Sequence, residues 1–281
     1  MSGAFKARSR PPPWLIYPGA AGALLLAALA FRPHADAPAP PPLLSRQART
    51  ALAQATPFDT LAVRPVRRAF GGPEDTAFAI GDGGLWLAPA QLVRGCKHPA
   101  ILVGGGRGVT ATARSPRSGG GLAVLTTPGG APALPLAAKP PAMGSLAYVA
   151  GYVRGRPGEV AMRLIGPAAA PAGGRRRPGT SVLAWAAIGR TEGLGSDLTG
   201  LVGAPALDEG GRVVGVVLGW RPRRGRIYAA APDAILEALR GSGARPPAGA
   251  VGQPITRANY DLAADDLRRS HRVVGAICAN G

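Results

Sequence analysis

The chain has few cysteine, histidine, aromatic and acidic residues, and each scarcity narrows what it can do. Two of its 281 residues are cysteine and three are histidine, and only His98 lies near a cysteine in the sequence, which leaves a structural zinc short of its four ligands unless chains associate. Aromatic residues make up only 5% of the chain, and no basic stretch carries the interleaved aromatic side chains on which nucleic-acid bases stack. We therefore expect no metal, no cofactor and no nucleic-acid partner.

Acidic residues are outnumbered by basic ones, 15 to 33, so the formal net charge is +18. An excess of positive charge of this size favours an anionic partner. Many of the arginines lie in two runs. The runs are Arg175, Arg176 and Arg177, then Arg221, Arg223, Arg224 and Arg226. Outside the cytoplasm the candidate partners are anionic lipid headgroups, a cell-wall polymer or an acidic protein. A solvated surface that reflects arginine-rich codon usage is the alternative.

One apolar stretch indicates where the chain resides. Residues 14–31 contain no charged side chain and follow Lys6, Arg8 and Arg10. Eighteen such residues suffice to cross a bilayer, and the basic flank stays on the cytoplasmic side. The pattern predicts a single-pass inner-membrane anchor with the main domain in the periplasm. A cleaved signal peptide remains open, because 35–37 has an A-x-A form, although Pro38 disfavours cleavage there.

Proline and glycine mark the domain boundaries. A polyproline-like spacer occupies 33–42, and a second low-complexity joint occupies 242–252. We therefore divide the chain into five parts: a cytoplasmic N-terminus (1–13), the anchor (14–31), a Pro-rich linker with a short helix (32–69), the main domain (70–241) and a C-terminal extension (242–281). The glycine run at 104–108 lacks the Lys-Ser/Thr pair and the helix of a phosphate loop, so it predicts a hairpin turn.

A motif in the second half carries a family resemblance. Residues 200–216 read G-L-V-G-A-P-A-L-D-E-G-G-R-V-V-G-V. The pattern resembles the G-[ND]-S-G-G-P nucleophile loop and following hairpin of trypsin-like serine proteases of the Deg/HtrA and chymotrypsin type. Val202 occupies the serine position. Because valine has no hydroxyl to activate, acyl-enzyme chemistry cannot begin at this residue.

Two further matches cover the remaining triad positions. Residues 76–93 resemble the family hairpin G-T-A-F-x-I-x-x-x-G-x-x-L-T-A-x-H-V-V, with Gln91 in the histidine position. Residues 121–125 resemble the D-L-A-V-L strand that carries the triad aspartate, with Gly121 in its place. Glutamine cannot accept a proton near neutral pH. All three matches occur in family order, and each lacks its catalytic residue.

The resemblance covers roughly residues 70–240 and implies an all-β fold of two six-stranded Greek-key barrels. With the flanking segments, the expected architecture adds an N-terminal transmembrane helix and a C-terminal helix-strand extension. The implied function is that of a catalytically inactive pseudoprotease, a binding or scaffold subunit with a protein partner in an envelope complex. The alternative is a serine endopeptidase-like hydrolase with rearranged catalytic residues. In either case, Gln91, Gly121 and Val202 should converge between the barrels.

Substitute catalytic residues are scarce. The histidines are His34 in the proline-rich spacer, His98 seven residues past the family's histidine position, and His271 after a predicted helix. From 76 to 207 the acids are Asp82, Glu159, Glu192 and Asp197. Ser196 beside Asp197 is more typical of a turn than of a nucleophile pair. The residues therefore favour the inactive form over the rearranged hydrolase.

The two cysteines are far apart in the sequence, at 96 and 278. In an oxidising compartment two lone cysteines usually pair, so we predict a disulfide between Cys96 and Cys278. It would join the C-terminal tail to the first barrel. The tail itself predicts a helix within 255–270 and a strand at 272–278, in the place where Deg/HtrA proteases carry a PDZ domain.

Overall fold

The computed structural model describes residues 57–58, 61–69, 74–114, 121–168, 182–192, 194, 198–245 and 252–280. The predicted anchor at 14–31, the proline-rich spacer, His34 and Arg175–Arg177 lie outside these residues, as do Ser196 and Asp197. Within the described part of the chain, no helix is both long and apolar enough to span a membrane. All described residues belong to one compact unit, residues 40–281.

The first half of the unit is an eight-stranded sheet with the order β1-β5-β4-β14-β2-β3-β7-β6. The strands are Val63–Pro65 (β1), Glu74–Gly81 (β2), Leu85–Pro89 (β3), Pro99–Gly104 (β4), Arg107–Thr110 (β5), Thr112–Arg114 (β6), Leu122–Thr126 (β7) and Val273–Cys278 (β14). A short helix, α3 (Ala90–Val93), follows β3. The turn predicted at 104–108 is confirmed: it joins β4 to β5, and Gly104, Gly105 and Gly106 all have positive φ.

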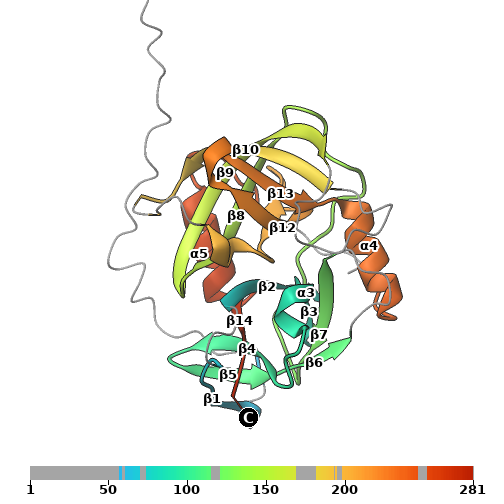
Figure 1. Cartoon of the computed structure of the whole chain (residues 1–281), viewed down its shortest axis with the longest axis vertical. Helices are drawn as coiled ribbons and strands as arrows, with labels where there is room; N and C mark the ends of the chain where they lie inside the picture. Colours follow the sequence, from blue (N-terminus) through green and yellow to red (C-terminus); the bar gives the residue numbers. More distant parts are fainter. Residues whose placement is uncertain are drawn as a thin grey trace, which may run out of the picture. The chain divides into compact units, whose positions relative to one another are not determined.

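The second half is a closed six-stranded barrel with the order β10-β13-β12-β11-β8-β9 (Figure 1). Its strands are Leu146–Val153 (β8), Arg156–Ala168 (β9), Val182–Arg190 (β10), Pro205–Leu207 (β11), Val213–Arg221 (β12) and Arg226–Ala230 (β13). Two 3-10 turns, η1 (Thr199–Leu201) and η2 (Pro222–Arg224), precede β11 and β13.

The expected pair of closed barrels is therefore only half confirmed. The first half is a sheet that, among the described residues, ends at β1 on one side and at β6 on the other. Both of these edge strands are three residues long. The all-β prediction itself is confirmed.

Strand β2 is buried on both faces and separates two apolar cores. Phe78 points into a cluster that also contains Tyr148 of the barrel. Ala77, on the opposite face, packs with Trp86 inside the first sheet. Alternate residues of a strand point to opposite faces, so a strand between two cores reads as a continuous apolar run. The run T-A-F-A-I at 76–80 has this form.

The C-terminal segment is built into the first sheet. After α4 (Pro232–Gly241), α5 (Tyr260–Arg269) packs on the barrel and leads into β14. Figure 1 shows β14 running between β2 and β4, and it pairs antiparallel with both. The predicted helix and strand are confirmed, but the strand is a central member of the sheet rather than an addition at its edge.

Candidate functional site

Helix α3 carries Gln91 at the junction of the two halves. The Ala90 amide donates to the Gly121 carbonyl at 2.8 Å, which holds the start of the helix against the beginning of β7. The Gln91 side chain donates through Nε2 to Oδ1 of Asp75 at 2.9 Å. The amide group at the predicted histidine position is therefore bonded to a carboxylate on β2.

Asp75 is a site residue that the sequence analysis leaves out, since it considers acids only from residue 76 onward. The side chain is 2% exposed, and its Oδ2 atom has no hydrogen-bond partner. Burial raises the pKa of Asp75 to about 6, and the hydrogen bond from Gln91 partly opposes this increase. The alternation of β2 could have revealed it, because Asp75 shares its face with the apolar residues Ala77 and Ala79.

Gly121 lies just before β7 in a left-handed conformation, with φ of 78°. A Cβ atom at this position would lie 3.2 Å from Cδ2 of Leu218, a residue of β12. An aspartate here would therefore meet an apolar side chain and adopt a backbone conformation that L-residues rarely take. The side chain of Leu218 therefore occupies the space into which a side chain at position 121 would point.

Val202 belongs to a loop that packs tightly against β2. The Thr76 amide donates to the Val202 carbonyl at 2.9 Å, and the Thr76 hydroxyl donates to the Gly200 carbonyl at 3.1 Å. At Gly203, with φ of 88°, a Cβ atom would lie 2.0 Å from the Thr76 carbonyl oxygen. Only glycine fits there. Val202 itself is buried, with 7% of its surface exposed.

These contacts bring the three predicted positions together around two consecutive residues of β2. Gln91 bonds to Asp75, and Val202 bonds to Thr76. Gly121 joins the group through its hydrogen bond to the residue before Gln91. The expected convergence between the two halves is therefore present in the backbone and in these hydrogen bonds.

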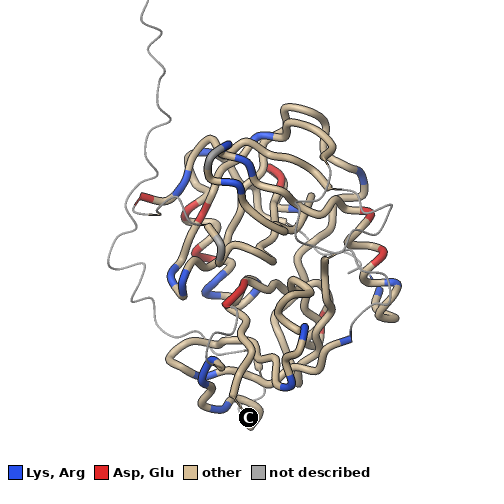
Figure 2. Tube along the Cα trace, in the orientation of Figure 1, with Lys and Arg blue, Asp and Glu red and all other residues tan. Residues whose placement is uncertain are grey.

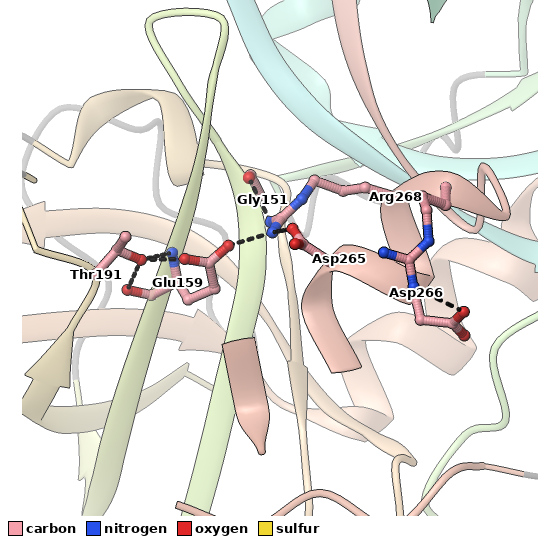
Figure 3. A network of polar contacts seen from close by, with 7 residues as sticks. Gly151, Glu159, Thr191, Asp265, Asp266 and Arg268 are labelled. Atoms are coloured by element: carbon pink, nitrogen blue, oxygen red, sulfur yellow. Dashed lines mark hydrogen bonds and ion pairs between the residues drawn. The ribbon is translucent and has the colours of Figure 1, made fainter. Parts of the chain in front are cut away.

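A buried ionic network lies behind the Val202 loop (Figure 3). Arg268 of α5 contacts the carboxylates of Glu159 and Asp265, and its Nη1 donates to the Gly151 carbonyl at 3.3 Å. Glu159 also accepts a hydrogen bond from the Thr191 hydroxyl. The side chains of Arg268 and Glu159 are 7% and 1% exposed. One cation on the C-terminal helix thus connects β8, β9 and the first residue after β10.

The network is continuous with the Val202 loop. The amide of Tyr152, the residue after Gly151, donates to the Thr76 hydroxyl at 3.0 Å, and that hydroxyl donates to the Gly200 carbonyl. A Cβ atom at Gly151 would lie 2.8 Å from Thr76 Oγ1 and 2.9 Å from Cδ2 of Leu201. Arg268 is therefore linked through Glu159 to Thr191 and, through the Gly151–Tyr152 backbone and the Thr76 hydroxyl, to the Gly200 carbonyl.

The remaining polar candidates lie elsewhere or have structural roles. His98 and Glu192 are exposed, and Asp82 accepts a hydrogen bond from the Ala133 amide at 3.3 Å. His271 lies 3.4 Å from the Val103 carbonyl through Nε2, and its ring packs edge-on against Phe58. Among the described residues, no three His, Cys, Asp or Glu side chains are grouped closely enough to hold a metal ion.

The two cysteines form a disulfide with an S–S distance of 2.08 Å and a Cα–Cα distance of 5.7 Å. Cys96 follows α3 by three residues, and Cys278 is the last residue of β14. The disulfide therefore fixes the segment after α3 to the sheet. The hydrogen bond between Gln91 and Asp75 fixes the helix itself to β2.

The second arginine run surrounds the turn between β12 and β13. Arg221 and Arg224 are exposed and Arg226 is half-buried, while Arg223 lies in η2. The assignment of these residues to an anionic partner is a proposal.

Comparison with known proteins places the fold. No protein-family model matches the chain, and no curated protein sequence does. Solved structures of Rv3671c match it: an inactive form of a variant from M. tuberculosis H37Rv has 23% identity and a TM-score of 0.52, covering 67% of this chain and 89% of that one. The active form of the Rv3671c protease from M. tuberculosis has 19% identity and a TM-score of 0.50, covering 75% and 95%. The chain has a trypsin-like protease fold. At these identities the likeness extends to the fold alone.

Proposed function

We propose that the chain is a catalytically inactive trypsin-like pseudoprotease. The proposal depends chiefly on the position equivalent to the nucleophile, where Val202 is buried and has no hydroxyl. Its neighbours support the same conclusion: Gln91 has no basic nitrogen, and Gly121 has no side chain. Leu218 lies against Gly121, so a side chain at the acid position would have to displace a leucine methyl group.

The proposed role is that of an extracytoplasmic binding or scaffold subunit, tethered by residues 14–31 to the inner membrane. The sequence supports the tether through its uncharged span and basic flank. The glycines that pack the Val202 loop onto β2 and β8 support a retained loop shape, because no larger residue fits these close backbone contacts. The expected partner is a protein of an envelope complex.

A fluorophosphonate serine probe tests the inactivity directly. The full chain should remain unlabelled, as should Val202→Ser, because no residue is available to deprotonate the new hydroxyl. An active trypsin-like protease in the same reaction is the positive control. Labelling of the unmodified chain contradicts the proposal, and labelling of Val202→Ser alone means that a base is already present.

One observation favours a second candidate, a hydrolase with rearranged residues. Asp75 is a buried carboxyl with a pKa near 6, and it lies within hydrogen-bond distance of the Gln91 side chain. A carboxyl in this state can act as a general base or acid. Digestion of a peptide mixture, followed by mass spectrometry between pH 5 and pH 8, tests this candidate. Turnover that disappears in Asp75→Asn would establish it, and the absence of turnover at every pH supports the pseudoprotease.

A further inference from the structure

Asp75 belongs to an otherwise apolar row of the first sheet. In the strand register, Asp75 of β2 pairs with Ala276 of β14. The row continues through Ile101 of β4 and Val109 of β5, and these three partners lie in the apolar core around Trp86. Residues that are directly opposite in neighbouring strands share a face of the sheet. The carboxyl group of Asp75 therefore lies on the face that carries an apolar core.

The elements that pack against β2 and α3 supply no charge to balance this carboxyl. Strands β3, β4, β7 and β14, helix α3 and the turn η1 contain no acidic or basic residue, and Figure 2 accordingly draws these strands tan throughout. Their titratable groups, together with those of β8, are Tyr148, Tyr152 and the disulfide-bonded Cys278. A tyrosine hydroxyl is neutral in the range where a carboxyl titrates. None of these elements therefore presents a cation to Asp75.

The charged residues on either side of the contact point elsewhere or are exposed. The preceding residue, Glu74, points to the opposite face of β2 and pairs with Arg68 at 3.0 Å. Beyond α3, the side chains of Arg94, Lys97 and His98 are exposed. Among the described residues, the hydrogen bond from α3 is thus the one polar contact of the buried carboxyl.

The Gln91 and Asp75 side chains match each other fully only when Asp75 carries a proton. A carboxylate accepts hydrogen bonds but cannot donate them, whereas an amide group does both. The ionised form therefore takes one hydrogen bond, from Nε2 of Gln91 to Oδ1 at 2.9 Å, and its Oδ2 is buried without a partner. A protonated Oδ2 can donate to Oε1 of Gln91. A neutral pair with two hydrogen bonds then replaces a buried charge with one.

Gln91 lies where it can make and break this contact. Its side chain is exposed, although the carboxyl that it bonds is only 2% exposed. Turning the amide group into solvent would break one hydrogen bond and admit water to Asp75. The next residue, Leu92, is fully buried, so the helix itself can stay in place.

We propose that Gln91 and Asp75 form a proton-operated gate at the seam between α3 and β2. With the carboxyl protonated, the two side chains bond to each other and the gate is closed. When the proton passes to solvent, Gln91 turns outward and water solvates the carboxylate. The gate gives the chain a surface that changes with pH at the proposed histidine position. The inference goes beyond the proposed function and does not rest on it, because it requires neither activity nor a partner.

The size of the effect follows from proton linkage. In the closed arrangement, burial raises the pKa of Asp75 from 3.8 to about 6, and the hydrogen bond from Gln91 partly opposes this increase. In the open arrangement water surrounds the carboxyl, so its pKa returns toward 3.8. A difference of about two pKa units makes opening about 100-fold more favourable for the ionised form. The closed state is therefore favoured fully below about pH 4, and this advantage is lost as the pH rises through 6.

Glutamine side-chain NMR tests the gate in the full chain in detergent micelles. Labelling with ¹⁵N-glutamine gives four side-chain amide groups, and Gln91→Asn identifies the Gln91 signal. Gln253 is exposed, so the exchange of its amide protons with water is the reference at each pH. We expect the exchange rate of the bonded Gln91 proton, relative to Gln253, to rise about 100-fold between pH 4 and pH 7. A ratio that stays constant over this range would overturn the proposal.

Three variants identify the titrating group. Asp75→Asn keeps a donor and an acceptor for Gln91, so the exchange ratio should remain at its acid value at every pH; a rise like that of the unmodified chain would refute the gate. Glu74→Gln removes the adjacent carboxyl, and His98→Gln removes a histidine, a residue that ordinarily titrates between about pH 5 and 8. Both controls should keep the rise, and its loss in either would assign it to another group. If Asp75→Asn does not fold, the unmodified chain and these two controls still decide the question.

Discussion

Replacing Arg268 with methionine should destabilise the protein strongly, because the change strands buried carboxylates. Methionine preserves much of the aliphatic stem but removes the guanidinium that contacts Glu159, Asp265 and the Gly151 carbonyl. The Glu159 side chain is 1% exposed, so water cannot replace the lost partner.

The expected magnitude follows from that burial. Removing one partner of a buried ion pair costs about 3–5 kcal/mol, a large part of the roughly 5–15 kcal/mol that stabilises a typical domain. For a domain of this size, such a loss lowers Tm by roughly 6–20 °C. The neighbouring Arg269 supplies a matched control: its pair with Asp266 spans 3.5 Å, with the two side chains 35% and 40% exposed. Arg269→Met should cost at most about 1 kcal/mol.

Denaturant unfolding of both variants measures the difference, and hydrogen exchange locates it. In Arg268→Met the amides of Tyr152 and Thr191 should exchange faster than in the unmodified chain, because Gly151 and Glu159 lose their contacts with Arg268, while β4 and β5 should change least. Adding Glu159→Gln to Arg268→Met should recover part of the stability, because the buried charge is removed. Equal losses in Arg268→Met and Arg269→Met, or a double variant that is weaker still, would refute this reasoning.

Three other substitutions have defined outcomes. Cys278→Ser opens a disulfide that spans 182 residues, so denaturant unfolding should show a loss of about 5 kcal/mol in the chain-entropy model, with faster proteolysis of the tail; an unchanged midpoint contradicts this. Burial raises the pKa of Asp75 to about 6, so the folded state binds this proton more tightly than the unfolded state does. The contribution of this proton to the free energy of unfolding is therefore fully present below about pH 4 and is lost as the pH rises through 6. Asp75→Asn should therefore flatten the dependence of stability on pH between 4 and 6, and an unaltered slope would exclude Asp75 as its source. Gly121→Ala should cost about 1–2 kcal/mol in thermal or denaturant unfolding, because its φ is 78°, and a neutral result would mean that the backbone relaxes there.

Short-range patterns made much of the fold predictable. The order of the strands follows from apolar runs bounded by glycine and proline, and the hairpin after Leu207 follows from Asp208, whose Oδ1 accepts the Gly210 and Arg212 amides at 2.9 and 2.8 Å. The positions of Gln91, Gly121 and Val202 followed from motif order. In each case the signal lies within a few residues of the feature it specifies.

Features that depend on pairing across long distances in the sequence were not predictable. The run V-V-G-A-I-C indicates a strand but cannot reveal that β14 inserts between β2 and β4, because nothing local encodes a partner some 200 residues away. Asp75 differs, because the alternation of β2 marks it as an acid on an apolar face, while its hydrogen bond to Gln91 is visible only in the fold.

Each residue at the three proposed triad positions has a structural role. These roles help to explain why a chain that had lost catalysis, as we propose, would not regain it. Gln91 holds α3 to β2 through Asp75, Val202 is buried behind its bond to Thr76, and Gly121 occupies a backbone conformation that suits glycine. A side chain at position 121 would strain a backbone with positive φ, whereas a serine at position 202 would keep the backbone bond to Thr76, and no single reversion would restore chemistry without the other two. Stability therefore opposes a return at position 121 in particular, and the contacts between the loop and β2 do not depend on catalysis. Selection for binding could preserve this arrangement without any selection for hydrolysis.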